Sequence, residues 1–427
     1  MTRRSIVTLI AALALLFSFA IDLSLTRKYG GVDLRDKVVG ARSLLEGRTM
    51  YRNPWRPGEP ERLADPMVPP GAEMTRYTGT PFQSLVLAPL GMLSFGNARL
   101  MWLVMQYALL LAAFLFMLRG FGEGDERSHL IAATALVVLL VSTSWRLHVE
   151  RGQVYILFGA LLAALFWSLK KERHLLAGAI AASLMLFKPT YAFLLLPLLV
   201  RVKLRMLLGG AGLIAVAAAA FAVIPNGLAS WSEYLDAMRA WSAMPGLGAP
   251  PSVDPGAFEY PATIEGLSNL RDHHKMEFEN GSIGAVLLAV GGIALPGWAP
   301  WAAYGLILVL SAYMLRRELP GVQGTRLLLL GFLAWTVLMM ILPTPRFDYQ
   351  LVHWIGPVLF VLLGERERTF GNNVLFGLAA MLVVGAWGIL PVNILIAEAL
   401  LIAACGWALL QTRLTDEPAS RCAIESR

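Results

Sequence analysis

Residues 170–205 read KKERHLLAGAIAASLMLFKPTYAFLLLPLLVRVKLR. Two basic clusters, Lys170–Arg173 and Arg201–Arg205, enclose two apolar segments, 175–187 and 190–200, that meet at Lys188-Pro189. Each segment is shorter than the roughly 20 residues that a membrane-spanning helix needs. Because short basic loops of membrane proteins face the cytoplasm, we expect both clusters on that side. The two segments are therefore predicted to enter the membrane and return, with the Lys-Pro pair at the far end.

The composition is that of a membrane protein. Of 427 residues, 57% are hydrophobic and only 15% are charged, and the mean hydropathy is +0.61. Soluble domains carry about a quarter charged residues, so a soluble enzyme, a disordered chain, a collagen and a disulfide scaffold are excluded. Two cysteines, Cys405 and Cys422, are too few for a disulfide framework or a cysteine-based metal site. The net charge of +7 fits loops that contact anionic lipid headgroups, and no nucleic-acid partner is expected.

The same charge rule places the rest of the chain. Segment 5–25 follows Arg3 and Arg4, so the N-terminus is expected inside. A retained first helix is favoured over a cleaved signal peptide. Placing all four basic loops inside, with Arg316-Arg317 and Glu365–Arg368 added to the two above, requires segments 81–95 and 282–295 to lie along the outer face or dip into it. The other runs expected to cross are 99–118, 129–145, 153–169, 206–224, 299–315, 327–342, 350–363, 373–390 and 392–411.

The predicted fold is an all-α polytopic integral membrane protein with about ten spans plus re-entrant segments. It forms a single membrane domain over residues 1–427 with both termini inside. Two long loops, 26–80 and 225–281, lie outside, and residues 412–427 form a cytoplasmic tail.

Polar residues concentrate at the outer ends of these segments, whereas the spans are almost free of charge. A transporter is expected to carry charged residues near the middle of the membrane. The topology instead brings the following to one face: Asp33, Asp36, Tyr77–Pro81, Glu150–Gln153, Lys188-Pro189, Asn280–Ser282 and Arg346–Tyr349. Acids and bases of this kind serve proton transfer, and cations bind anionic groups such as phosphates. The pattern predicts an active site between the outer loops and the helix ends.

The order of these motifs resembles glycosyltransferase family 87 of the GT-C superfamily, from about Asp33 to the 360s. The motifs that carry the resemblance are Asp33-Leu34, Tyr77–Pro81, Gly152-Gln153, Ala177-Gly178 with Lys188-Pro189, Asn280–Ser282 and Pro345–Tyr349. Three features depart from the family pattern: the Tyr-Pro element is longer than usual, Tyr155 stands where an Asn often follows the Gly-Gln pair, and the Pro345–Tyr349 element has one residue fewer. Each motif alone is weak, and it is their order on a matching hydropathy profile that indicates the family.

The resemblance implies an enzyme of a group that includes polyprenol-phosphate-mannose-dependent α-mannosyltransferases. Such an enzyme transfers a hexosyl group, here expected to be mannosyl, from a polyprenyl-phosphate sugar to a hydroxyl of an envelope glycan or glycolipid, with inversion. The active site is expected to face the exterior of the bacterial cytoplasmic membrane, and no metal or other cofactor is expected. Two alternatives stay open, which are a lipid or glycan transporter and a glycan polymerase or ligase with a diphosphate-linked donor.

The resemblance also assigns roles to residues. Asp33 is the expected general base with Asp36 as its backup, and the alternative for Asp33 is to cap a helix that starts near Leu34. The cations expected to bind the donor phosphate are Lys188, Arg346 and Arg151, and for Lys188 the alternative is an interaction with lipid headgroups.

The side chains expected to bind the sugar or the acceptor are Tyr77, Gln153, Asn280 and Asp348, and their alternatives are caps, turns and the aromatic belt of the membrane interface. A metal site at His273-His274 is not expected, because the spacing with Glu277 and Glu279 fits no familiar zinc motif.

Overall fold

The computed structural model describes residues 3–28, 30–51, 58–64, 66, 77–122, 124–242, 282–284, 286–287, 292–293, 295–315, 323–342, 347–364, 370–385 and 392–415. Within these ranges the chain is helical and contains no strand. The first helices are α1 (Arg3–Lys28), α2 (Leu34–Leu45), η1 (Glu61–Leu63), α3 (Pro81–Val86), α4 (Ala88–Gly91), α5 (Phe95–Phe121), α6 (Glu126–Val141), α7 (Thr143–Arg151) and α8 (Tyr155–Lys170). They are followed by α9 (His174–Phe187), α10 (Tyr191–Leu195), η2 (Leu196–Arg201), α11 (Leu204–Val223), α12 (Ser230–Ser242), α16 (Ala299–Leu315), α17 (Gly324–Ile341), η5 (Asp348–Trp354), α18 (Ile355–Gly364), α19 (Phe370–Gly385) and α20 (Val392–Thr415).

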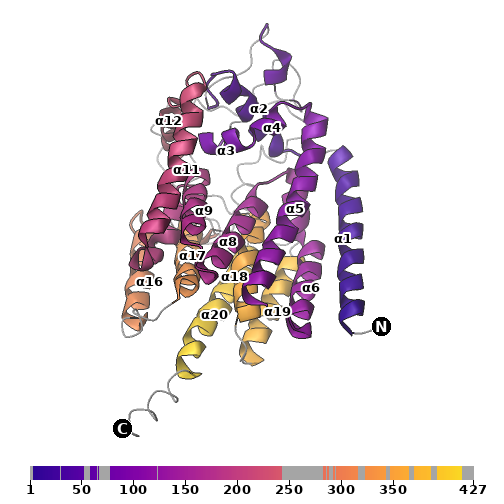
Figure 1. The fold of residues 1–427 in the computed structure, drawn as a ribbon, viewed down its shortest axis with the longest axis vertical. Helices are drawn as coiled ribbons and strands as arrows, with labels where there is room; N and C mark the ends of the chain where they lie inside the picture. The colour runs from indigo at the N-terminus through magenta and orange to yellow at the C-terminus, as the bar shows by residue number, and fades with distance from the viewer. Residues whose placement is uncertain are drawn as a thin grey trace.

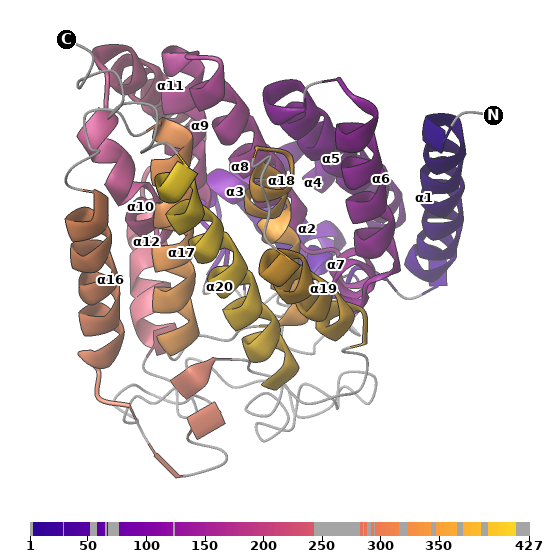
Figure 2. The ribbon, with the colours of Figure 1, turned by 90° about the horizontal axis from the view of Figure 1, so that it is seen from below.

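The long helices lie side by side, inclined to the longest axis of the molecule (Figures 1 and 2), and the short helices α2, α3 and α4 gather at one end of it (Figure 1). Helix α1 begins and helix α20 ends at the opposite end (Figure 1). Seen from that opposite end, α1 and α16 occupy opposite edges of the bundle (Figure 2). The end that carries α2, α3 and α4 is called the α2 end below, and the other end is called the basic end.

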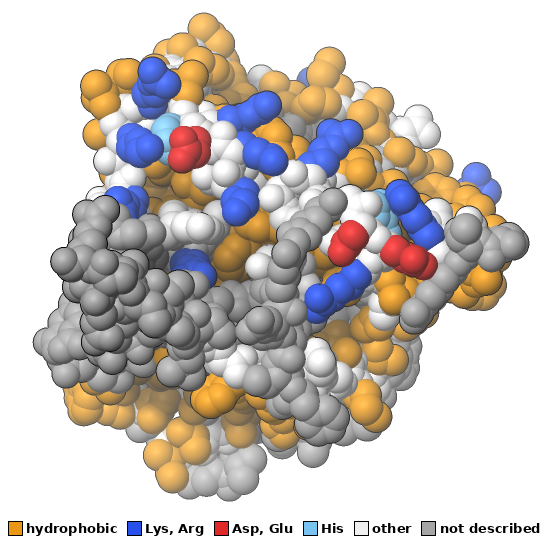
Figure 3. Space-filling view, turned by 60° about the horizontal axis from the view of Figure 1, so that its bottom comes forward, with side chains coloured by type: hydrophobic (Ala, Val, Ile, Leu, Met, Phe, Trp, Pro, Cys, Tyr) orange, Lys and Arg blue, Asp and Glu red, His pale blue; other side chains and the backbone are white. Residues whose placement is uncertain are grey.

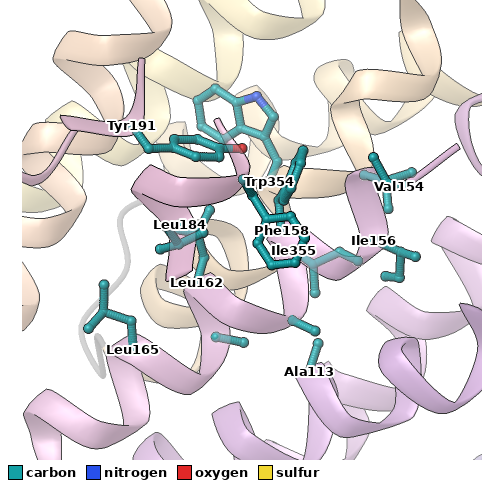
Figure 4. Packing of buried hydrophobic residues seen from close by; sticks show 14 of the residues in the cluster. Ala113, Val154, Ile156, Phe158, Leu162, Leu165, Leu184, Tyr191, Trp354 and Ile355 are labelled. Carbon is teal, nitrogen blue, oxygen red and sulfur yellow. The ribbon is translucent and has the colours of Figure 1, made fainter. Parts of the chain in front are cut away.

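Helix α8 lies at the centre of the hydrophobic core. Its side chains Ile156, Phe158, Leu162 and Leu165 are each no more than 3% exposed. Around them pack Ala113 of α5, Leu184 of α9, Trp354 of η5 and Ile355 of α18 (Figure 4). A helix that is apolar on all sides is buried among other helices, so α8 joins the first half of the bundle to the second.

Helices α9 and α11 approach each other through glycine. A Cβ atom added at Gly178 of α9 would lie 1.9 Å from the carbonyl oxygen of Met206, and one added at Gly209 of α11 would lie 1.9 Å from that of Leu175. No larger residue fits either position without separating the helices. Small residues of this kind let membrane helices pack with their backbones in close contact, and here they bring the first turns of α9 and α11 together.

A buried ion pair attaches α1 to the bundle. Asp22, which is 1% exposed, accepts hydrogen bonds from Arg146 of α7, from the hydroxyl of Tyr107 at 2.6 Å and from the indole N–H of Trp145 at 3.2 Å. Arg146 also donates to the carbonyl oxygen of Ser18 at 3.3 Å. Most other side chains of α1 face outward, so these contacts largely determine where α1 packs against the bundle.

The expected all-helical membrane fold is confirmed. Within the described residues, five helices (α1, α5, α11, α17 and most of α20) are long and apolar enough to span a membrane, and a sixth span arises if α6 and α7 are counted together. Those two helices are bent by 61° at Ser142, whose side chain caps α7 by accepting from the N–H of Trp145. Several other apolar helices have 10–17 residues, so the expectation of about ten spans remains a prediction.

Segment 81–95 folds as expected for a segment that does not cross the membrane. It forms α3 and α4, of six and four residues, before α5 begins. Helices this short cannot span a bilayer, and both lie at the α2 end (Figure 1). Segment 282–295 is described only in part, at 282–284, 286–287, 292–293 and 295, and Arg316-Arg317 and the loop 365–369 lie outside the described residues.

Two of the four basic loops meet in space, as the charge rule predicted. Lys170 from the first loop and Arg201 and Lys203 from the second line one cavity, together with the N-terminal residues of α17. Figure 3, which brings the basic end forward, shows several Lys and Arg side chains on this part of the surface. The hairpin made by α9, α10 and η2 therefore starts and finishes at the basic end, with Lys188 at its tip.

Candidate active site

Asp33 lies where the connection after α1 meets the end of α7. The N–H of Gly31 donates to the carbonyl oxygen of Glu150 at 2.7 Å, and the N–H of Asp33 donates to that of Arg151 at 2.8 Å. Helix α7 ends at Gly152, which has a φ of 72°. A Cβ atom at this glycine would lie 2.7 Å from Cβ of Leu34, so the left-handed turn and the close approach to α2 both require glycine.

The carboxylate of Asp33 is held by two side chains, one from the last residue of α7 and one from just after that helix. Its Oδ2 accepts from Nε of Arg151 at 2.7 Å and from Nε2 of Gln153 at 2.6 Å. Asp33 occupies the N-cap position of α2, but its side chain makes no capping hydrogen bond. The alternative of a simple helix cap therefore does not describe this side chain, which is directed toward Arg151 and Gln153 and remains 24% exposed.

Asp36, one turn along α2, lies in a more buried position. Its Oδ1 is 3.3 Å from Nζ of Lys37 and also accepts from the backbone N–H of Lys37 at 2.8 Å. Lys37 donates in addition to the backbone oxygen of Asp33. Burial raises the pKa of Asp36 to about 6; Lys37 opposes this effect and the charge of Asp33 adds to it.

Lys188 follows the last residue of α9 and lies among aromatic rings. Its Nζ is 5.3 Å from the ring centre of Tyr155, 5.5 Å from that of Trp335 and 6.0 Å from that of Tyr191. These rings come from α8, α17 and α10, so three helices converge on one ammonium group. The negative faces of aromatic rings attract a cation at such distances, so the three rings help to fix the position of the Lys188 ammonium group.

Aromatic contacts connect the two groups of residues. The guanidinium carbon of Arg151 lies 5.5 Å from the ring centre of Tyr349, which in turn lies 5.9 Å from that of Tyr155. We refer to the whole set as the Asp33–Lys188 cluster; its members are Asp33, Arg151, Gln153, Tyr155, Lys188, Tyr191, Trp335 and Tyr349. Of the residues predicted from sequence, it brings together Asp33, Arg151, Gln153 and Lys188.

The structure places Tyr77 in the protein interior. The side chain is 4% exposed, its hydroxyl donates to the carbonyl oxygen of Thr80 at 2.9 Å, and its ring lies 5.7 Å from that of Tyr51. Burial raises the pKa of the Tyr77 phenol. The ring packs against Gly40 of α2, so Tyr77 supports the helix that follows Asp33, and its role in sugar binding remains a prediction.

Other predicted site residues fall outside what the structure describes. Arg346 and Asn280 are not among the described residues, and neither is the pair His273-His274. Asp348 begins η5, but its side chain is not described. In the described part of the chain, no group of three or more His, Cys, Asp or Glu side chains is arranged to hold a metal ion.

Three aromatic members of the cluster, Tyr155, Tyr191 and Trp335, are not among the site residues predicted from the sequence. Tyr155 was noted only as a departure from a family pattern, and Tyr191 and Trp335 lie in apolar segments where aromatic residues usually belong to the core. The signal in the sequence that points to such residues is Lys188 itself, because a charge at the tip of an apolar hairpin needs stabilising contacts.

The Asp33–Lys188 cluster combines chemical functions that suit group transfer. A carboxylate can accept a proton, and the cations Arg151 and Lys188 can stabilise negative charge on a leaving group. The cluster also offers aromatic rings as surfaces for a ligand. Except for Trp335, which lies within α17, the members come from helix ends or from the residues next to them, where the topology was expected to place an active site.

The sequence matches the family model described as "Glycosyltransferase family 87" over residues 77–345, which is more than half of the chain. No curated protein sequence matches the chain. Among solved structures, the chain is similar to ArnT from Cupriavidus metallidurans bound to undecaprenyl phosphate. The identity is 13%, the match covers 99% of this chain and 80% of that one, and the TM-score is 0.37.

Proposed function

Because the chain belongs to glycosyltransferase family 87, we propose that the Asp33–Lys188 cluster is its active site and that its donor is a polyprenyl-phosphate sugar. The observation that carries the proposal is the carboxylate of Asp33, held at 2.7 Å by Arg151 in a cluster that also contains Lys188. Displacement at an anomeric carbon bonded to phosphate needs a base for the acceptor and a cation for the leaving group. The cluster supplies both.

Asp33 is proposed as the general base. Both hydrogen bonds from Arg151 and Gln153 go to Oδ2, and within the described residues no hydrogen bond reaches Oδ1. Oδ1 is therefore the oxygen that takes the proton from the acceptor hydroxyl. As that proton leaves, the acceptor oxygen bonds to the anomeric carbon, the bond from that carbon to the phosphate oxygen breaks, and polyprenyl phosphate departs. One displacement from the opposite side inverts the configuration.

Lys188 is proposed to bind the donor phosphate. The three rings around its ammonium group lie 5.3–6.0 Å from Nζ, so they hold the charge in place, and an ammonium group is a compact cation that attracts phosphate oxygens. Arg151 was also expected to bind phosphate, but its contacts with Asp33 and the Tyr349 ring favour a different role. We propose that Arg151 orients the base.

The remaining parts of the proposal follow the family resemblance. The sugar is a hexose, taken to be mannose, and the acceptor is a hydroxyl of an envelope glycan or glycolipid. The α2 end, which carries the cluster, is proposed to face the exterior of the bacterial cytoplasmic membrane, since the basic end is expected in the cytoplasm. Membership of a glycosyltransferase family favours this function over transport of a lipid or glycan.

The experiment is a transfer assay with the purified full-length protein in lipid nanodiscs. Radiolabelled mannose and glucose are supplied as polyprenyl monophosphate and as polyprenyl diphosphate donors, with glycolipids extracted from a bacterial envelope as acceptors. We expect labelled glycolipid from a monophosphate donor, and substitution of Lys188 by Gln is expected to raise the KM for that donor. Transfer from the diphosphate donor alone would reject the proposed donor class and support the polymerase or ligase alternative.

A further inference from the structure

A second polar site lies at the basic end, at the opposite end of α9 from Lys188. A cavity of about 450 Å³ is lined there by residues of three separate segments, which are 169–174, 198–206 and 323–325. Helix α9 has 14 residues between this cavity and the Asp33–Lys188 cluster, which corresponds to about 21 Å along the helix axis. The cavity is therefore distinct from the proposed active site.

The charged side chains that line this cavity carry a net positive charge. Lys170, Arg201 and Lys203 contribute three positive charges, and Glu172 contributes one negative charge. The ammonium of Lys203 donates to Nε2 of His174 at 2.8 Å. That bond leaves the imidazole proton on Nδ1, and among the described residues the buried Nδ1 of His174 has no hydrogen-bond partner.

Three helices begin at this cavity. The first residue of α9 is His174, and the residues just before α11 and α17 are Lys203 and Gln323; all three residues line the cavity. None of the three helices has a side-chain cap at its N-terminus. The first N–H groups of a helix have no partner within it and form the positive end of the helix dipole, so each helix adds to the attraction for an anion.

A buried hydroxyl provides independent evidence for a ligand. Thr325, in the first turn of α17, lines the cavity and is only 2% exposed. Within the described part of the chain, its Oγ1 has no hydrogen-bond partner. Buried hydroxyl groups are almost always hydrogen-bonded, and leaving one unsatisfied costs on the order of 1–3 kcal/mol. A ligand with acceptor oxygens would satisfy this group.

We propose that this cavity binds a phosphate ester. A phosphate group matches the lining, because its oxygens accept hydrogen bonds from ammonium and guanidinium groups, from helix N-termini and from a threonine hydroxyl. The ester is supplied either by the headgroup of an anionic lipid or by a soluble phosphate compound. The cavity lies where the basic loops are expected to meet lipid headgroups, and basic pockets between helices on that side bind such groups.

Bound phosphate would connect the two ends of the protein. Helix α9 leads from His174 to Lys188, and α17 leads from Thr325 to Trp335, which lies over the Lys188 ammonium. A ligand that holds the first turns of α9 and α17 together stabilises the two helices that position Lys188 and its ring partner.

The test uses the full-length protein in two kinds of nanodisc, one of phosphatidylcholine and one that also contains phosphatidylglycerol. A third sample has phosphatidylcholine nanodiscs with millimolar inorganic phosphate. The thermal midpoint of unfolding is measured in each, and native mass spectrometry counts the phosphatidylglycerol molecules that stay bound in detergent. The variants are Lys170→Gln with Lys203→Gln, and separately Thr325→Val, which keeps the shape of the side chain. Arg205→Gln is the matched control, because Arg205 belongs to the same loop but is exposed and does not line the cavity.

We expect phosphatidylglycerol or phosphate to raise the midpoint of the wild-type protein by several degrees, which is the size expected for ligand binding at about 100 times the dissociation constant. This shift and the retention of one tightly bound lipid are both lost in the double lysine variant, are weaker in Thr325→Val and persist in Arg205→Gln.

A shift with phosphatidylglycerol alone identifies the lipid as the source, and an equal shift with inorganic phosphate identifies a soluble ester. Equal shifts in all variants, or no shift with either probe, would overturn the proposal. If the double variant does not fold, Thr325→Val and Arg205→Gln decide the outcome.

Discussion

Nε of Arg151 donates to Oδ2 of Asp33 across 2.7 Å and so joins the last turn of α7 to the start of α2. The backbone supports the same junction, because the N–H of Asp33 donates to the carbonyl oxygen of Arg151 at 2.8 Å. The orientation of the Asp33 carboxylate is therefore determined by α7 and the residues that follow it, rather than by the helix that Asp33 precedes. This relationship makes Arg151 a positioning residue for the proposed base.

Arg151→Gln is expected to lower kcat by about 10- to 100-fold, because a misplaced base slows proton transfer while the contacts with the substrates remain. The KM for the donor should change much less, and Arg151→Lys should recover part of the rate. Initial-rate kinetics in nanodiscs measure both constants. An exposed arginine outside the cluster, Arg239, provides the matched control as Arg239→Gln. A rise in donor KM with unchanged kcat would instead assign Arg151 to the phosphate.

The rings around Lys188 are expected to matter for binding of the donor. A cation–π contact contributes about 0.5–2 kcal/mol, depending on how far the pair is shielded from water. Tyr155→Leu should therefore lower kcat/KM for the donor by about 3- to 30-fold, whereas Tyr155→Phe keeps the ring and should stay close to the wild type. Steady-state kinetics with varied donor compare the two. Equal loss in both variants would show that the hydroxyl, and not the ring, is the important group.

Asp36 is expected to make stability depend on pH. Burial raises its pKa in the folded protein from 3.8 to about 6. Because the folded state binds this proton more tightly than the unfolded state does, the stabilisation is complete below the unfolded pKa and is lost as pH rises through the folded one. Relative to Asp36→Asn, the wild type should gain stability on the order of 1–3 kcal/mol between pH 7.5 and pH 4.

Thermal melts of both proteins across that pH range measure this difference. Groups that titrate in both proteins cancel in the comparison. A constant difference between the wild type and Asp36→Asn would show that Asp36 has an ordinary pKa.

The pair Asp22 and Arg146 is expected to hold α1 against the bundle. Removing one member of a buried ion pair leaves the other charge without compensation and costs about 3–5 kcal/mol. Asp22→Ala should therefore lower the thermal midpoint strongly, and adding Arg146→Met should recover part of the loss. The control is Asp236→Ala, which removes an exposed pair with Arg239 and should cost less than about 1 kcal/mol. Additive effects of the Asp22 and Arg146 substitutions would contradict the coupling.

The sequence predicted the arrangement of the molecule better than its local detail. The basic loops at Lys170 and Arg201 meet at one cavity, segment 81–95 forms short helices, and Lys188 lies at the far tip of its hairpin. The family indicated by the motifs is confirmed by the match over residues 77–345. These features could be predicted because the membrane restricts on which side each basic loop lies, and this restriction applies along the whole chain.

Features that depend on packing were missed. The bend at Ser142 was not expected, since the apolar segment 129–145 runs past Ser142 without a proline or a glycine. Tyr77 looked accessible in a polar loop, but its ring packs against Gly40, a contact between residues far apart in the sequence. The rings around Lys188 were overlooked for the same reason, because aromatic residues in apolar segments resemble ordinary core residues.

The transfer rate of Asp33→Asn tests the central claim most directly. Asparagine keeps the size of the side chain, but it cannot take the proton from the acceptor hydroxyl. With saturating donor and acceptor, the rate should fall by about 10³-fold relative to the wild type, while Asp236→Asn, an exposed carboxylate on α12, should leave it unchanged. A rate for Asp33→Asn within threefold of the wild type, in protein with an unaltered thermal midpoint, would show that Asp33 is not the base.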